Sequence, residues 1–103
     1  MRTPQQYRDL LQGGNNAELD AQTARETNLL NGADVAANLT QAQIAALKTY
    51  FAEAKGNPQS KDDVYAAIGA ICFPRCTYAA PASQANQAQA LKVCGLAMRV
   101  AMA

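Results

Sequence analysis

A six-residue segment, LTQAQI at positions 39–44, carries the clearest local signal in the chain. Thr40 is a preferred N-cap residue, and Gln43 stands three positions later, which is the spacing of a capping box. Leu39 precedes the cap and Ile44 follows it by four positions, so these two side chains predict a hydrophobic staple. We therefore expect a helix to begin directly after Thr40.

Apolar residues at helical spacing continue this segment to about residue 55. Ile44, Leu47 and Phe51 recur at intervals of three or four, which places them on one face of a helix. The sequence GNP at positions 56–58 should end the helix, because proline lacks a backbone N–H and restricts the residue before it. A helix is predicted over residues 40–55.

A second helix is predicted directly after this break. Ser60 and Asp63 have the spacing of an N-cap residue and its N3 partner, and Pro74 should stop the helix that they begin. Its apolar face consists of Val64, Ile68, Ile71 and Cys72.

The last predicted helix follows the N-cap candidate Ser83 and is unusually apolar. Its only charges are Lys92 and Arg99, seven residues apart and therefore on one side. A helix that is apolar nearly all round is expected to be buried, either inside its own domain or between subunits.

The N-terminal third also carries helix signals, but few large apolar residues. Thr3 and Gln6 predict a capped start, and the glycines at 13–14 should end that short helix. A mostly polar second helix is predicted from Asn15 to about Leu30. Short isolated helices are marginal in water, so we expect this segment to be mobile in the free chain.

The sequence thus predicts an N-terminal helical arm, residues 1–32, and a helical core domain, residues 33–103, within a single-domain chain. The fold class is all-α, a small bundle of four to five short helices. We expect the arm to order against a neighbouring subunit or partner. Its candidate partner-binding residues are Tyr7, Leu10, Leu11, Leu29 and Leu30.

Composition points to a thin core. Of 103 residues, 23 are Ala, whereas Leu, Ile, Val and Phe together supply 18. Ala is the best helix former but buries little apolar surface. A small domain with such a core is marginally stable alone, so association with a partner would offset the deficit.

Charge argues against several functional classes. The formal net charge is +1, and the basic residues are scattered, which is unlike a dedicated nucleic-acid or anionic-membrane binder. No apolar stretch reaches the length of a membrane span, and the first residues lack the apolar core of a secretory signal. We expect a cytoplasmic protein, or one in a particle assembled in the cytoplasm.

The three cysteines do not match a metal site. Structural zinc normally takes four Cys or His ligands, whereas this chain has Cys72, Cys76, Cys94 and no His. Cys72 and Cys94 fall on apolar helical faces, where cysteine acts as a small hydrophobe. We expect reduced, metal-free thiols, although a disulfide from Cys94 to Cys72 or Cys76 is an alternative. No metal or cofactor is predicted.

No catalytic arrangement is evident either. Asp62 and Asp63 fall in the first turn of a helix, where acids complement the helix dipole. The helix pair over residues 40–72 has the length of a helix-turn-helix, but these acids would then face the DNA, which is repulsive. With no His to exchange protons near neutral pH, general acid–base catalysis has no candidate.

We therefore expect a non-enzymatic protein–protein interaction or assembly subunit, such as a structural component of a multi-copy, phage-like particle. Its expected partners are proteins, as a homo-oligomer or a larger assembly, with no membrane and no small-molecule substrate, and the scattered charge disfavours nucleic acid. The main alternative is a small regulatory or inhibitor protein that binds one protein target. A helix-turn-helix nucleic-acid regulator is a more remote alternative.

Overall fold

The computed structural model describes residues 2–11, 16–57, 59–74 and 84–102. All regular structure in these ranges is helical, so the predicted all-α class is confirmed. The helices of this part of the chain are α1 (Pro4–Leu11), α2 (Asn16–Leu30), α3 (Val35–Asn38), α4 (Gln41–Lys55), α5 (Lys61–Cys72) and α6 (Gln84–Met102).

Two helices begin at the capping boxes that the sequence predicts. At α4, Thr40 Oγ1 accepts from the Gln43 N–H at 3.0 Å, and Gln43 Oε1 accepts from the Thr40 N–H at 2.8 Å. At α1, Thr3 Oγ1 accepts from the Gln6 N–H at 3.2 Å, and Gln6 Oε1 accepts from the Thr3 N–H at 2.7 Å. Each box satisfies two backbone donors that a helix start leaves open.

The described residues test some of the other predicted helix boundaries but not all of them. Ser60 Oγ accepts from the Asp63 N–H at 3.1 Å, which is one half of the expected box at α5. The stops before Gly56 and Pro74 are confirmed, since α4 ends at Lys55 and α5 at Cys72. The predicted caps Asn15 and Ser83 lie outside the described residues.

The single-turn helix α3 was not predicted. Its N-cap is Asp34, whose carboxylate accepts from the Ala36 N–H at 3.0 Å. Before it, α2 ends in a tight turn at Gly32, where φ is +80°, a value that favours glycine. The turn reverses the chain, so α3 packs back against α2.

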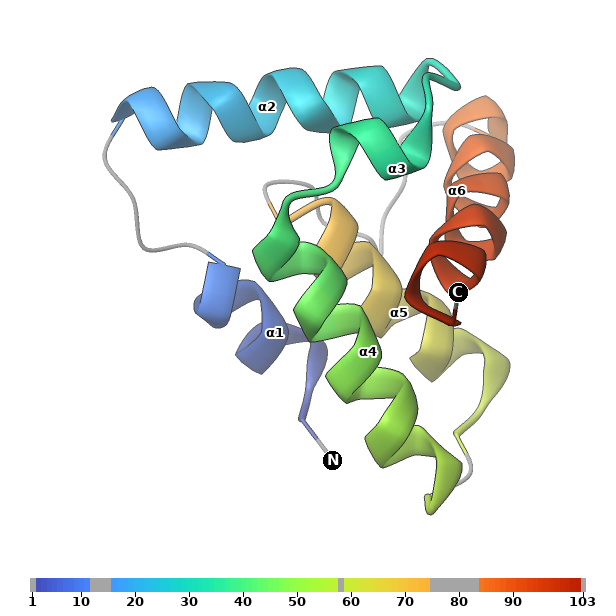
Figure 1. Cartoon of the computed structure of the whole chain (residues 1–103). Helices are drawn as coiled ribbons and strands as arrows, with labels where there is room; N and C mark the ends of the chain where they lie inside the picture. The colour runs from blue at the N-terminus through green and yellow to red at the C-terminus, as the bar shows by residue number, and fades with distance from the viewer. Residues whose placement is uncertain (1, 12–15, 58, 75–83, 103) are drawn as a thin grey trace.

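Helix α5 is the centre of the molecule. All of its residues from Ala67 to Cys72 are buried. In Figure 1, α4 and α5 lie between α1 on the left and α6 on the right, while α2 crosses the top, and α5 contacts α1, α4 and α6. Core side chains come from all six helices and include Tyr7, Leu29, Val35, Leu47, Ile68 and Val93.

A buried polar side chain ties the start of α4 to the end of α5. Gln43 is almost fully buried, and beyond its capping bonds its Nε2 donates to the Ile71 carbonyl at 3.0 Å. Its donor and acceptor groups are therefore both used, as a buried amide requires. Leu39 is buried beside this point, and Ile44 packs against the core.

The N-terminal helices share this core. Tyr7 and Leu29 belong to the same buried cluster as Ile68, and α1 packs most extensively against α5. The expected boundary between an arm, 1–32, and a core, 33–103, is therefore not a packing boundary in this conformation. The mobility of the N-terminal segment in solution stays a prediction.

Helix α6 buries one face and leaves the other open. Val93, Ala97 and Ala101 are buried, whereas Met98 and Met102 are exposed. One face of this apolar helix is therefore buried in its own domain, and the exposed face leaves burial between subunits open. No helix in the described part of the chain is long and apolar enough to cross a bilayer.

Candidate functional site

The five candidate partner-binding residues differ in burial and fall into three groups. Tyr7 and Leu29 have no exposed surface, so they contact no partner while α1 and α2 are packed this way. Leu11 and Leu30 are partly buried against the core. Leu10 is the exception, with 62 % of its surface exposed.

Tyr7 is held in the core by an aromatic contact and a polar one. Its ring meets the ring of Tyr50 edge-on, with centroids 5.5 Å apart. Its hydroxyl donates to Glu53 Oε2 at 3.2 Å, and Arg2 Nη1 lies 3.2 Å from Glu53 Oε1. Burial raises the pKa of Tyr7 to about 12; Arg2 opposes this rise and the Glu53 carboxylate adds to it.

The outer side of α1 carries a shallow hollow of about 320 Å³, lined by Arg2, Gln6, Asp9 and Leu10. We call these four residues the α1 surface. Asp9 accepts a hydrogen bond from the neutral amide of Gln5 at 2.8 Å. The hollow therefore combines an exposed apolar side chain with an exposed carboxylate, on a helix that Tyr7 anchors in the core.

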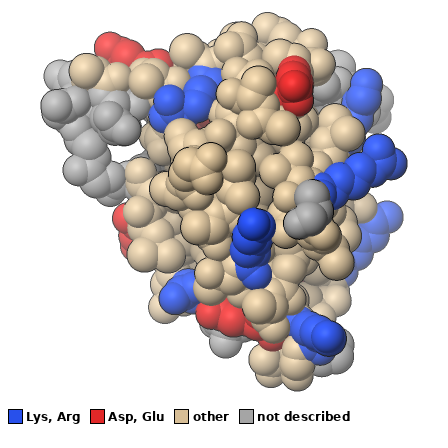
Figure 2. All heavy atoms as spheres, in the orientation of Figure 1, with Lys and Arg blue, Asp and Glu red and all other residues tan. Residues whose placement is uncertain are grey.

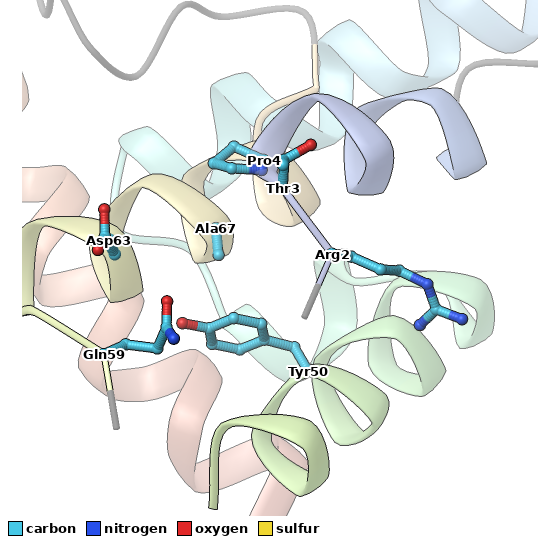
Figure 3. A pocket seen from close by; sticks show the side chains of 7 residues that line it. All are labelled: Arg2, Thr3, Pro4, Tyr50, Gln59, Asp63 and Ala67. Atoms are coloured by element: carbon cyan, nitrogen blue, oxygen red, sulfur yellow. The ribbon is translucent and has the colours of Figure 1, made fainter. Parts of the chain in front are cut away.

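Arg2 also lines a second, smaller pocket of about 220 Å³, between the start of α1, the second half of α4 and the start of α5. Figure 3 shows its lining residues: Arg2, Thr3, Pro4, Tyr50, Gln59, Asp63 and Ala67. In this view the Tyr50 hydroxyl points toward Gln59 and Asp63, while the Arg2 guanidinium points away from them. We call this the Tyr50 pocket.

Tyr50 is 1 % exposed, yet its hydroxyl has no hydrogen-bond partner in the part of the chain that the structure describes. Tyr7 and Phe51 hold the ring from two sides, the latter with centroids 5.4 Å apart. Burial raises the pKa of Tyr50, and the nearby charge of Asp63 raises it further. The hydroxyl is therefore neutral and closed off from solvent.

A further candidate surface lies on α6. Its members are exposed and lie along one face of the helix over successive turns: Lys92, Gly95, Met98, Arg99 and Met102. We call these residues the α6 surface. A Cβ built on Gly95 meets nothing within 4 Å, so the space beside it is open. Met102 is 71 % exposed and Met98 38 %.

The α6 surface is basic, because α6 contains no Asp or Glu. In Figure 2 basic side chains project from the right of the molecule, on the side where α6 lies, and others stand at the upper left, in the centre and along the lower part of this face. The sequence missed this surface because apolar residues all round a helix do not reveal which ones the domain buries. Tyr50 was missed because an aromatic at helical spacing is normally a core residue.

Asp62 and Asp63 are exposed in the first turn of α5, where the sequence places them. Cys72 is buried, while Cys76 and the Cys94 side chain lie outside the described residues. Among the residues that the structure describes, no three Cys, Asp or Glu side chains gather as metal ligands would. Comparison with protein-family models, with curated proteins and with solved structures finds no match to this chain.

Proposed function

We propose that the protein is a non-enzymatic assembly subunit that contacts further copies of itself through its α1 and α6 surfaces. One observation carries this proposal. The large apolar side chains that stand out as exposed in the described structure, Leu10, Met98 and Met102, lie on two helices at opposite sides of the molecule.

Single exposed apolar residues are common on protein surfaces, so the argument for a contact surface rests on what lies next to these three side chains. On α6, Met98 and Met102 adjoin Gly95, whose missing side chain permits close approach of another chain. On α1, Leu10 borders a hollow. In the proposed contact the methionines of α6 enter the hollow beside Leu10, whose other lining residues are polar.

One charge of the α1 surface, that of Asp9, is opposite in sign to the charges of the α6 surface. The α6 surface carries Lys92 and Arg99 without any acid, whereas the α1 surface carries Asp9. The positive charge of Arg2 is already paired with Glu53, which reduces its repulsion toward an incoming basic helix. Contact between the two surfaces would place Met102 near Leu10 and Arg99 near Asp9.

Such a contact joins two different surfaces, so it is heterologous. Repeated from copy to copy, it closes into a ring or continues as a filament. A component present in many copies, in the cytoplasm or in a particle assembled there, would use such a repeating contact. It would also stabilise a chain whose own core is Ala-rich and thin.

Analytical ultracentrifugation of the full chain tests the proposal. We expect the mass to exceed the 10.9 kDa of one chain and to rise with protein concentration. Leu10→Glu and Met102→Glu each place an acid in one apolar contact and should both lower the mass to that of the monomer. Thr49→Glu adds the same charge at an exposed position of α4 outside both surfaces and should change nothing.

A wild-type chain that stays monomeric at every concentration would overturn the assembly proposal. The alternative of a regulatory protein that binds a single target would then be the better account.

A further inference from the structure

The two methionines in the described part of the chain both lie on the open side of α6. Met102 is 71 % exposed and Met98 38 %, and they are four residues apart, so their side chains are neighbours on the helix surface. The buried apolar side chains of the described residues belong to Leu, Ile, Val, Ala, Tyr, Phe and Cys. The two thioether sulfurs are thus at the surface, in the patch that the proposed contact uses, and not in the core.

A thioether sulfur that solvent reaches is open to oxidation by peroxide. A lone pair of the sulfur attacks one oxygen of hydrogen peroxide, and the O–O bond breaks. The proton of the transferred oxygen passes to the departing hydroxide, which leaves as water. The sulfur loses two electrons to the peroxide, and the product is methionine sulfoxide. Because Met102 is more exposed than Met98, it should react first.

Oxidation turns an apolar side chain of the α6 surface into a polar one. The sulfoxide oxygen is a hydrogen-bond acceptor, and burying such a group without a donor costs its desolvation. In the proposed contact Met102 lies near Leu10, whose side chain has no donor. A sulfoxide at position 102 therefore opposes the contact.

A second effect follows from the place of Arg99 beside Met102. Arg99 precedes Met102 by three positions, so the two side chains are neighbours on α6. The Arg99 guanidinium carries donors only, and a sulfoxide oxygen at position 102 gives it an acceptor within its own chain. That hydrogen bond competes with the proposed attraction between Arg99 and Asp9 of a second copy.

The other half of the contact has no such chemistry. The α1 surface consists of Arg2, Gln6, Asp9 and Leu10 and contains no sulfur. Cys72, whose sulfur lies in the core, has no exposed surface. Among the described residues, peroxide therefore finds its accessible sulfur atoms on the α6 surface.

We propose that Met98 and Met102 form an oxidation site through which hydrogen peroxide releases the assembly, and that methionine sulfoxide reductases restore it. The inference rests on the proposed assembly function, because it assigns a regulator to the same α6 surface. Oxidation disfavours the contact, and a contact that covers the two sulfurs shields them from peroxide. The chain should keep its fold, since neither methionine belongs to the buried core.

Peroxide treatment of the full chain tests the inference. Dilute chains are treated with hydrogen peroxide, and catalase then removes it. Peptide mass spectrometry locates the oxidised residues, and analytical ultracentrifugation gives the mass at a concentration at which untreated chains assemble. We expect sulfoxide at Met102 and then at Met98, an unchanged circular dichroism spectrum, and a fall in mass to that of one chain. The concentration needed for assembly should rise on the order of tenfold or more.

Reduction separates the methionines from the cysteines. Dithiothreitol alone reduces disulfides and sulfenic acids but not methionine sulfoxides, so it should not restore the assembled mass. Dithiothreitol together with methionine sulfoxide reductases for both sulfoxide epimers should restore it.

The double variant Met98→Leu, Met102→Leu is the matched control. Leucine keeps a similar apolar volume without the sulfur, and all three cysteines remain. Judged against its own untreated sample, this variant should lose no mass with peroxide. The reductase experiment uses the wild-type chain only, so it decides the inference independently of this variant.

Assembly that persists with Met98 and Met102 fully oxidised would overturn the inference. So would a loss of mass that follows oxidation elsewhere while these two residues stay intact, or that dithiothreitol alone reverses. A wild-type chain that is monomeric before any peroxide is added is a different outcome, because it removes the assembly proposal itself and this inference with it.

Discussion

Two buried tyrosines in edge-to-face contact differ in what their hydroxyls meet. Tyr7 Oη donates to the Glu53 carboxylate at 3.2 Å, whereas Tyr50 Oη has no partner among the described residues. A hydrogen bond to a charged group stabilises the folded state, while an unpaired buried hydroxyl destabilises it. The same chemical change at these two positions should therefore have opposite effects.

We predict that Tyr50→Phe raises the free energy of unfolding by about 1 kcal/mol, because it removes a buried group that gains nothing from folding. Tyr7→Phe should lower the free energy of unfolding by about 1–2 kcal/mol, because it removes the bond to Glu53. Urea denaturation of both variants at neutral pH gives the comparison. A loss of stability in Tyr50→Phe equal to that in Tyr7→Phe would show that the Tyr50 hydroxyl is bonded in the folded protein.

Stability should also fall in alkali. The pKa of Tyr7 is about 12 in the folded protein against 10.0 in the unfolded chain, so the folded state holds the proton more tightly. The contribution of the protonated Tyr7 hydroxyl to the free energy of unfolding is therefore complete below pH 10. It is lost as the pH rises toward 12, by up to about 3 kcal/mol. Tyr50 acts in the same direction. Denaturation between pH 9 and 12 should show a shallower decline in Tyr7→Phe than in wild type, and identical declines would contradict the shift.

At the scale of elements, local signals predicted starts and stops well. The Thr40–Gln43 and Thr3–Gln6 boxes are present, and α4 ends directly before Gly56. These features depend on neighbours within a few residues, so the sequence contains them directly. The single turn of α3 was missed because its only start signal is Asp34, with no apolar periodicity behind it.

Contacts between distant elements could not be predicted in this way. Tyr7 and Glu53 are 46 positions apart, and no spacing pattern in the sequence predicts the hydrogen bond between them. The same holds for the bond from Gln43 to the Ile71 carbonyl. The sequence named Leu10 as a contact residue together with Tyr7, and only packing against α5 separates the exposed side chain from the buried one.

The double role of Gln43 gives a test at this scale. Thr40→Ala removes one cap and should cost on the order of 1 kcal/mol of stability. Gln43→Ala removes the other half of the box and the bond to Ile71, and should cost more, about 2–3 kcal/mol. Thermal or urea denaturation measures both. Equal losses would mean that the link from α4 to α5 contributes little.

At the scale of the whole molecule, the N-terminal helices contribute to the common core. The mobility expected from the sequence and the burial of Tyr7 make opposite predictions for the amides from Tyr7 to Leu11. Burial predicts that they are protected from hydrogen exchange about as well as the amides from Ile44 to Phe51. Exchange of the Tyr7–Leu11 amides at the rate of an unfolded chain would instead support the mobile arm that the sequence predicts. Dilute protein should be used, so that neighbouring copies do not supply the protection.

The whole molecule also carries α1 and α6 on opposite sides, an arrangement that suits contact from one copy to the next. Neither surface follows from the sequence alone. Met98 and Met102 are indistinguishable from buried apolar residues of the same helix until the packing of α6 is known.

Mixing two variants tests the head-to-tail contact most directly. Leu10→Glu keeps an intact α6 surface, and Met102→Glu keeps an intact α1 surface, so each should be a monomer alone. An equimolar mixture measured by analytical ultracentrifugation should contain a dimer of one copy of each, near twice 10.9 kDa, and nothing larger. A mixture that remains entirely monomeric, or wild-type-sized assemblies of either variant alone, would contradict the pairing of these two surfaces.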